Sequence, residues 1–403
     1  MQRRSLLKAA ALTMSTAFAS PNRQPHIAVI GAGVFGGWTA LHLLRNGAKV
    51  TLLDAWGPGN SRASSGGETR IIRATYGPKP QYVRMAVRAL QLWKENEKRW
   101  GQKLFHRTGV LWMTSPEDEF EKASLPLLRE AGVEFEELSA AEAGKRFPQI
   151  NFEQVKWAIY ERDSGFLTAR RNCQTVLEHF LAEGGEYREL SVTPGAIQGR
   201  EMRPLTLSDK ASLPADQYVF ACGPWLGKVF PGVIGDLVRP TRQEVYFFGI
   251  PAGDARYAES QMPTWIDHGP SHFYYGIPGN DWRGFKAADD TRGAPFDPTT
   301  GDRTPTPEAI REVRRHVEFR FPGLKGAPLV EARVCQYEQT PDEEFIMDRH
   351  PGAANAWLLG GGSGHGYKHG PAVGEMMAGM VLGKKPVDQI FGMARFAGGK
   401  KGA

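Results

Sequence analysis

The sequence predicts an α/β protein of two domains, one of which is built from segments far apart in the chain. Its 403 residues suffice for two or three domains, and 41% hydrophobic against 23% charged residues is a globular balance. A strand, a glycine-rich turn, a helix and a second strand are indicated in succession over residues 26–54. A similar turn between an apolar run and a helix recurs over residues 356–381. Two such turns in distant segments favour one ligand-binding domain that both complete.

The first glycine-rich unit has the order of a Rossmann-type dinucleotide-binding motif. Residues 26–30 form a short apolar run of strand length, and the sequence GAGVFG begins directly after it at Gly31. A helical stretch over residues 38–45 and a second apolar run over residues 50–53 then lead to Asp54. A GxGxxG sequence alone is a weak signal, but with both strands, the helix and the acid in place it indicates a dinucleotide site.

Each residue of this motif has a physical task. Gly31 allows the tight turn, Gly33 lets the backbone approach a pyrophosphate, and Gly36 lets helix and strand pack closely. The free N–H groups at the start of the helix then face the phosphates. Asp54 is placed to accept a hydrogen bond from a ribose hydroxyl, and its charge disfavours a 2′-phosphate. The motif therefore predicts NAD or FAD and argues against NADP.

The segments that follow separate these two cofactors. An NAD enzyme would normally continue the parallel sheet with another helix, whereas residues 61–73 are a glycine- and serine-rich loop with three arginines. A third apolar run over residues 218–221 ends in a small-residue turn. The second glycine-rich turn, at residues 360–368, lies between the apolar run 356–359 and a helical stretch over 372–381. This arrangement favours FAD in a domain assembled from distant segments.

The N-terminus has the features of an export signal, expected over residues 1–19. A basic start with paired arginines precedes an apolar stretch over residues 9–18, and an A-x-A cleavage site ends at Ala19. The arginine pair resembles the twin-arginine type, so we expect that machinery to export the folded protein to the periplasm or the cell exterior. An uncleaved interfacial helix is the alternative. Cleavage would lower the formal net charge from +6 to +3, which removes the main support for nucleic-acid binding.

Composition disfavours other classes of protein. No apolar run approaches the ~18 residues that span a bilayer, so an integral membrane span is not expected. Three cysteines in 403 residues do not make a disulfide scaffold, and no CxxC or clustered Cys/His spacing indicates a metal site. Cys173 and Cys222 are interpreted as core residues, and no metal is predicted.

Six stretches, spread over nearly all of the chain, carry a resemblance to a known family. They are GAGVFG with Asp54, GGETRIIRATYG (66–77), HFYYGIP (272–278), GFK (284–286), VCQYEQTPDEEFIMDRHP (334–351) and GGSGHGYKHGPAVGE (361–375). In these stretches the chain resembles the monomeric sarcosine oxidase and N-methyltryptophan oxidase group within the D-amino-acid-oxidase-like flavoproteins.

The resemblance implies a bound FAD and two interleaved domains. The Rossmann-type FAD-binding domain is expected to comprise residues 22–80, 165–235 and 325–395. The substrate domain, built on a mixed and largely antiparallel sheet, is expected to comprise residues 81–164 and 236–324. A monomer is compatible with the resemblance, although the sequence does not fix the oligomeric state.

The resemblance also implies roles for charged residues. Cys335 lies where this group attaches its flavin covalently through the 8α-methyl carbon, and a buried free cysteine is the alternative. Lys286 matches the lysine that activates oxygen, since a fixed cation in a dry site stabilises the superoxide formed on electron transfer. Arg73 and Lys368 match the pair that binds the substrate carboxylate. Arg70 is expected beside the flavin, where it supports negative charge on reduction.

Aromatic and glycine residues complete the implied site. Tyr275 and Tyr337 match positions that wall the substrate pocket, although a core role alone is the alternative. Gly362, Gly364 and His365 belong to the second glycine-rich turn at the cofactor. His365 is expected to pack within this turn rather than to act as a base.

The implied reaction is the oxidation of secondary or N-substituted amino acids. The substrate would bind as the neutral amine, pass hydride equivalents to FAD and leave as an imine, and O₂ would reoxidise the flavin to give H₂O₂. Two alternatives are a dehydrogenase that passes electrons to a quinone or carrier and a flavin-binding protein without turnover.

Two departures from the group affect the expected substrate. Ser65 and Gly66 replace a histidine pair, and Asp290 replaces a pocket histidine four residues after the oxygen-activating lysine. An acid at this position could pair with a second cationic group on the substrate or face solvent. Sarcosine itself is therefore not the expected substrate.

Overall fold

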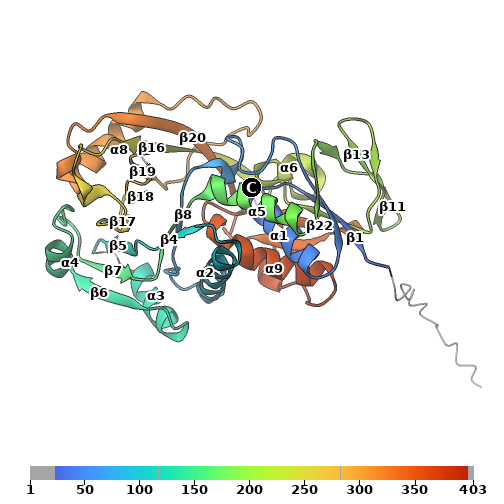
Figure 1. Cartoon of the computed structure of the whole chain (residues 1–403), viewed down its shortest axis with the longest axis horizontal. Helices are drawn as coiled ribbons and strands as arrows, with labels where there is room; N and C mark the ends of the chain where they lie inside the picture. Colours follow the sequence, from blue (N-terminus) through green and yellow to red (C-terminus); the bar gives the residue numbers. More distant parts are fainter. Residues whose placement is uncertain (1–22, 117, 282, 398–403) are drawn as a thin grey trace, which may run out of the picture.

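Two large sheets, side by side along the long axis, organise the molecule (Figure 1). The computed structural model describes residues 23–116, 118–281 and 283–397, so the predicted export segment at 1–19 lies outside the described residues. In Figure 1 the first sheet is on the right and includes β1 (His26–Ile30). The second sheet is on the left and includes β17 (Thr264–Gly269).

The first sheet is the predicted Rossmann-type sheet. β1 pairs in parallel with β2 (Lys49–Asp54) on one side and with β15 (Gln217–Phe220) on the other, and β22 (Ala353–Gly360) extends the sheet beyond β15. These strands are mostly buried, as expected of a parallel sheet covered on both faces. In spatial order, the described strands are β21 (Ile346–His350), β22, β15, β1, β2 and β9 (Glu186–Glu189). Segments far apart in the sequence thus form one sheet.

Three helices pack on one another beside the first sheet. α1 (Val34–Arg45) begins within the GAGVFG turn and is buried over almost its whole length, between α5 (Ala169–Ala182) and α9 (Gly370–Val381). A helix that is apolar on nearly all sides is suited to such a position. Gly374 lets α9 approach α1 closely, because a Cβ there would overlap the backbone of Trp38.

The second sheet is mixed and largely antiparallel, as predicted. β16 (Arg239–Phe248) pairs antiparallel with β20 and β19, whereas β17 pairs in parallel with β5. In spatial order, the described strands are β20 (Leu329–Gln339), β16, β19 (Phe285–Asp289), β18 (His272–Ile277), β17, β5 (Val110–Thr114), β7 (Trp157–Glu161) and β6 (Phe135–Ser139). Strand pairing therefore extends this sheet past residue 324, where the substrate domain is expected to end. The long β20 also contacts η1 (Ser64–Gly66), which belongs to the glycine-rich loop of the first half.

A small sheet lies between the two large ones and fixes the arginine-containing loop. Its described strands are β3 (Arg70–Ile72), β8 (Gly165–Leu167) and β4 (Phe105–His106). β3 begins at Arg70, and it pairs antiparallel with β8. The loop that follows the second Rossmann strand therefore ends in a strand whose position is set by the rest of the fold.

Several helices begin earlier than their apolar periodicity predicts. α1 starts at residue 34 rather than 38, and α9 starts at residue 370 rather than 372. Glycine and proline in a first turn carry no periodic apolar signal. A proline is nevertheless tolerated there, because the first N–H groups of a helix have no partner within it.

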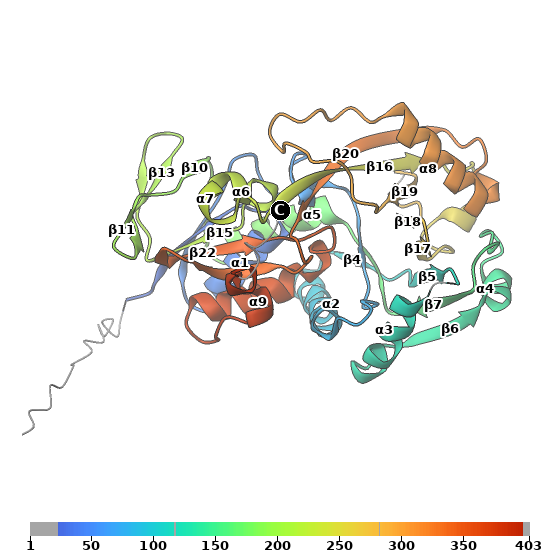
Figure 2. The ribbon, with the colours of Figure 1, turned by 180° about the vertical axis from the view of Figure 1, so that it is seen from behind.

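The remaining described elements cover the faces and ends of these sheets, and Figure 2 shows the small strands β10, β11 and β13 beside α7 at the outer end of the first half. No helix in the described ranges combines the length and apolarity needed to cross a membrane. The elements are α2 (Pro80–Trp100), α3 (Glu119–Glu130), α4 (Ala140–Arg146), α6 (Leu226–Val229), α7 (Pro231–Ile234), α8 (Pro307–Arg320), β10 (Val192–Thr193), β11 (Ile197–Gln198), β12 (Glu201–Met202), β13 (Leu205–Leu207) and β14 (Ser212–Leu213).

Candidate functional site

A cavity opens where the parallel strands of the first sheet end. It is lined by the turns that follow β1, β15 and β22 and by the end of β2. Ligands bind at this edge of open α/β sheets, since strand ends and helix starts leave backbone groups unpaired there. The predicted cofactor-binding residues among its lining are Gly31, Gly33, Asp54, Arg70, Gly362 and Gly364.

The glycines of the first turn have backbone geometries that other residues would not fit. Gly31 has a φ of +106°, and a Cβ there would overlap the carbonyl of Ala221. A Cβ on Gly36 would overlap the carbonyl of Gly31, so glycine is needed for α1 to leave β1 so closely. Gly33 lines the cavity, and Ser65 Oγ accepts a hydrogen bond of 3.1 Å from the first N–H group of α1. Ser65, one of the residues that replace a histidine pair, thus holds the start of this helix.

Two carboxyl groups face the cavity. Asp54 accepts hydrogen bonds from the N–H groups of Ala32 at 2.8 Å and Trp56 at 2.9 Å, and burial raises its pKa. Glu338 of β20 is 7% exposed, and burial raises its pKa to about 7. Its Oε2 atom has no hydrogen-bond partner, which is rare for a buried polar atom and indicates a missing ligand group. Sequence reasoning did not identify Glu338, although it lies within the stretch 334–351 and is an acid in a mostly buried part of β20.

These features fit a dinucleotide. Gly31 and Gly33, which have no side chains, line the cavity beside the start of α1, where a pyrophosphate can approach the backbone. Asp54 ends the strand that normally supplies the acceptor for a ribose hydroxyl. Glu338 offers a further acceptor, and Arg70 offers a cation at the same cavity.

Arg70 connects Lys286 with Cys335, because Arg70 and Lys286 share the backbone carbonyl of Thr69 and Arg70 also lies beside the Cys335 thiol. Arg70 Nη1 donates to this oxygen at 2.8 Å, and Lys286 Nζ donates to it at 3.0 Å. Arg70 Nη2 lies 3.5 Å from Cys335 Sγ. Burial lowers the pKa of Lys286 well below its ordinary value, and the charge of Arg70 lowers it further. The structure therefore joins three predicted site residues that come from different strands.

Arg73 and Lys368 meet at Tyr76. The Arg73 guanidinium carbon lies 4.6 Å from the ring centres of both Tyr76 and Trp112. Lys368 Nζ is buried and donates to the Tyr76 hydroxyl at 2.9 Å. Burial lowers the pKa of Lys368 well below its ordinary value, and repulsion from Arg73 adds to this effect. Two neighbouring cations of this kind gain most from a bound anion such as a carboxylate.

Tyr275, Tyr337 and Asp290 form a third group of predicted residues. The Tyr337 hydroxyl donates to Asp290 Oδ1, and Tyr337 also lines the cavity. The ring centre of Tyr275 lies 5.5 Å from Lys286 Nζ. Burial raises the pKa of Asp290, whereas the surrounding cations favour its ionised form. Asp290 therefore faces other side chains of the site rather than open solvent.

Glu161, at the end of β7, fixes the loop at residues 73–77, and sequence reasoning did not identify it. Its carboxylate is 1% exposed. It accepts hydrogen bonds from the N–H groups of Ala74 and Thr75 at 2.8 Å each, from Thr75 Oγ1 at 2.6 Å and from Ser164 Oγ at 2.5 Å. A single acid at a strand end has no periodic signal, so only the fold reveals this role.

His365 lies beside the cavity rather than among its lining residues. Its ring packs against Tyr82 and Phe345, and its Nε2 atom lies 3.1 Å from the carbonyl oxygen of Glu343. The backbone carbonyl of His365 accepts a hydrogen bond of 2.9 Å from Lys368 Nζ. This residue therefore helps to orient a cation of the site through its backbone.

The two cysteines interpreted as core residues have different surroundings. Cys173 is buried, and burial raises its pKa to about 11. Cys222 is half-buried and lines the cavity in the turn after β15. Cys222 therefore contacts both the core and the site.

Comparison with known proteins agrees with this geometry. The family described as "FAD dependent oxidoreductase" matches residues 26–380. Monomeric sarcosine oxidase of Arthrobacter sp. (strain TE1826) is 32% identical over 92% of this chain and 96% of that protein. N-methyl-L-tryptophan oxidase of Salmonella heidelberg (strain SL476) is 28% identical over 92% of this chain and 98% of that protein.

A solved structure shares the fold across both sheets. L-proline dehydrogenase from P. horikoshii superposes with a TM-score of 0.81 at 21% identity, and the match covers 93% of this chain and 98% of that one. The family match, the relatives of similar length and the cavity at the strand ends lead to one assignment. The chain belongs to the FAD-dependent oxidoreductases, in the branch that includes monomeric sarcosine oxidase.

Proposed function

We propose that the protein is an oxidase of secondary or N-substituted amino acids, which it converts to imines while O₂ is reduced to H₂O₂. The observation that carries this proposal is that two cations, Arg73 and Lys368, both contact Tyr76. A third cation, Lys286, donates to the backbone carbonyl of Thr69. Sarcosine oxidase and N-methyl-L-tryptophan oxidase, by their names, act on N-methyl amino acids.

The cavity residues would hold FAD, which when bound accepts a hydride from the carbon next to the amine nitrogen. Gly31, Gly33 and the start of α1 would contact its phosphates, and Asp54 would contact its ribose. Cys335 is our proposed point of covalent attachment. Its thiol lies 3.5 Å from Arg70 Nη2, and Arg70 lines the cavity that would hold the flavin.

The remaining polar residues would bind and orient the substrate. The planar Arg73 guanidinium can bind both carboxylate oxygens, and Lys368 adds a point charge beside it. Lys286 would stabilise the negative charge that forms on oxygen as it is reduced. The Arg73 guanidinium packs against the rings of Tyr76 and Trp112, and this packing restricts its movement and so fixes where a carboxylate would bind.

We further propose that the preferred substrates carry a second cationic group. Asp290 is half-buried beside Tyr337, whose hydroxyl donates to it, and its nearest cation is Arg292 at 4.0 Å. Once a substrate carboxylate engages the Arg73–Lys368 pair, Asp290 keeps its hydrogen bond from Tyr337 but has, among the described residues, no cation closer than Arg292 at 4.0 Å. A basic substituent on the amino acid would supply a closer cation.

A dehydrogenase that transfers electrons to a quinone or carrier is the second candidate, and one observation favours it. The pKa of Lys286 is lowered by burial and by Arg70, and a neutral amine would not stabilise superoxide. The oxidase proposal therefore requires that negative charge close to Lys286 restore its proton during turnover.

The deciding experiment uses the purified flavoprotein and a panel of N-methyl amino acids with neutral, acidic and basic side chains. Bleaching of the flavin in the absence of air identifies substrates. Re-admission of air then distinguishes the two candidates, since rapid recovery of colour with stoichiometric H₂O₂ supports the oxidase. Slow recovery in air but rapid recovery with a quinone dye would establish the dehydrogenase, and failure of every amine to bleach the flavin would refute both.

We also propose that residues 1–19 direct export by the twin-arginine machinery to the periplasm or beyond. The paired arginines and the A-x-A site support this proposal. Cell fractionation of the wild type and of the double variant Arg3→Lys, Arg4→Lys tests it. Export of both proteins to the same extent would contradict it.

A further inference from the structure

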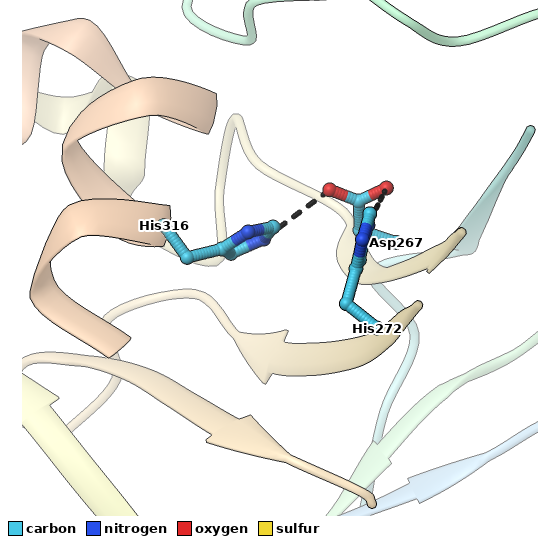
Figure 3. A group of neighbouring side chains, drawn as sticks. All are labelled: Asp267, His272 and His316. Atoms are coloured by element: carbon cyan, nitrogen blue, oxygen red, sulfur yellow. Dashed lines mark ion pairs between the residues drawn. The ribbon is translucent and has the colours of Figure 1, made fainter. Parts of the chain in front are cut away.

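A cluster of one acid and two histidines lies in the second sheet, apart from the residues that line the FAD cavity. Asp267 comes from β17, His272 from β18 and His316 from α8 (Figure 3). Figure 3 shows the two imidazoles approaching the same carboxylate from different sides. No short sequence motif joins these residues, which is why cysteine and histidine spacing predicts no metal.

The distances within this cluster match those between ligands of one metal ion. His272 Nε2 lies 3.4 Å from Asp267 Oδ1, and His316 Nε2 lies 3.2 Å from Asp267 Oδ2. One ligand atom from each residue lies within 4.8 Å of the others. Tetrahedral zinc with bonds of about 2.0–2.1 Å separates its ligand atoms by roughly 3.3 Å. Small side-chain rotations would therefore complete a coordination sphere.

The Nε2 atoms of His272 and His316 have no hydrogen-bond partner elsewhere in the described part of the fold. Both Nε2 atoms are buried and make no hydrogen bond, although each is close to the carboxylate. In a simple Asp–His hydrogen bond the N–H group would point at the oxygen, and these rings are not aligned in that way. Two buried nitrogens that converge on one carboxylate without hydrogen bonding to it favour a third, shared partner.

The packing around the cluster positions both histidine rings. Gly269 makes room for the His272 ring, because a Cβ at residue 269 would overlap that ring. The Tyr274 ring stacks on the His316 ring, with 3.8 Å between the two ring centres.

Arg320 occupies only one side of the carboxylate. Its Nε donates to Asp267 Oδ2 at 2.7 Å, and its Nη1 donates to the backbone carbonyl of Glu153 at 3.0 Å. Oδ1 accepts no such bond from Arg320 and is free to coordinate. Hydrogen bonding of the second oxygen of a ligating carboxylate is a usual means of orienting it.

We propose that Asp267, His272 and His316 bind one divalent transition-metal ion of the zinc class. Asp267 Oδ1 and the two Nε2 atoms supply three ligands, and water takes the fourth position on the side where His272 is 27% exposed. The ion links α8 to the β17–β18 hairpin. Its function is to strengthen the substrate domain, separately from the redox reaction.

The test is titration of the flavin-loaded protein, first treated with a chelator, with Zn²⁺ in a calorimeter and with Co²⁺ in a spectrophotometer. We expect one ion per chain and Co²⁺ absorption bands at wavelengths beyond those of the flavin. His272→Gln and His316→Gln should each weaken binding at least tenfold and abolish the rise in melting temperature that Zn²⁺ produces in the wild type.

His268→Gln is the matched control, because His268 is also on β17 and lies 2.6 Å from a carboxylate oxygen of Glu121. This variant should bind Zn²⁺ as the wild type does. Asp267→Asn is avoided, since it would leave Arg320 buried without its partner. Absence of stoichiometric binding, or binding that survives in both histidine variants, would overturn the proposal.

Discussion

Replacement of Glu161 by glutamine tests how strongly one buried carboxylate holds the loop at residues 73–77. Oε1 accepts from the N–H and hydroxyl groups of Thr75, and Oε2 accepts from the N–H group of Ala74 and the hydroxyl of Ser164. Glutamine keeps the shape of the side chain but exchanges one acceptor oxygen for an NH₂ donor. Whichever oxygen is lost, one backbone N–H group and one hydroxyl lose their acceptor.

The expected loss of stability follows from these contacts. The hydroxyl can rotate to accept from the new amide, but the backbone N–H cannot, and an unpaired buried donor costs about 1–3 kcal/mol. The two remaining hydrogen bonds also lose the extra strength that a charged acceptor provides. We therefore expect Glu161→Gln to reduce the free energy of unfolding by ~2–4 kcal/mol. Movement of the loop should displace Arg73 and raise KM for the substrate at least tenfold, with a smaller change in kcat.

The assay combines urea unfolding, followed by tryptophan fluorescence, with steady-state kinetics at equal flavin content. Glu137→Gln is the control, because Glu137 is exposed and pairs with Arg129 at 2.6 Å on the surface. Such a pair contributes about 0–1 kcal/mol, so the control should behave almost as the wild type. A loss below ~1 kcal/mol with an unchanged KM in Glu161→Gln would refute the reasoning.

Three further predictions concern the cofactor region. In Cys335→Ser, acid precipitation should release the yellow colour into the supernatant, whereas a pellet that stays yellow would exclude attachment at this residue. Lys286→Met should slow reoxidation of the flavin by O₂ about 10²–10³-fold while anaerobic reduction by substrate stays within a few-fold, as stopped-flow absorbance would reveal. Because burial raises the pKa of Glu338 from 4.5 to about 7, flavin-free protein should lose up to ~3 kcal/mol of stability as pH rises through this interval. Glu338→Gln should remove this loss of stability. The same pH dependence of the urea unfolding free energy in the variant and the wild type would contradict the prediction.

The sequence predicts those parts of the fold that are determined by residues close together in the chain. The GAGVFG turn needs glycine where the φ of Gly31 is +106° and where a Cβ on Gly36 would overlap a carbonyl. Short apolar runs then identify β1, β2, β15 and β22, because buried parallel strands are apolar throughout. The position of β20 in the second sheet has no such local cause. It depends on pairing with β16, nearly a hundred residues earlier, and a domain boundary drawn at residue 324 separates two strands that share a ladder.

The site shows the same division between local and distant causes. Residues within motifs, such as Arg73 and Lys368, are found in the sequence because each belongs to a recognisable stretch. Glu161, Asp267 and His316 lie outside these stretches, whereas Glu338 and His272 lie inside two of them but have no role that the resemblance assigns. Their roles arise only from burial and from what the folded chain brings near them: unpaired N–H groups, an open cavity, or two imidazoles. Neither residue type nor spacing carries that information.

The two buried lysines connect the electrostatics of the site to its choice of substrate. Lys286 and Lys368 both have pKa values well below the ordinary one, because burial removes water and an arginine lies near each. Holding either lysine protonated in the empty site is therefore costly. A ligand carboxylate beside Arg73 and Lys368 reverses this balance, since its charge compensates for the lost hydration. A plain amine brings no such charge and leaves the cations uncompensated. In the proposed function, selection for amino acids over amines would follow from the cost of these uncompensated cations as much as from contacts with the bound carboxylate.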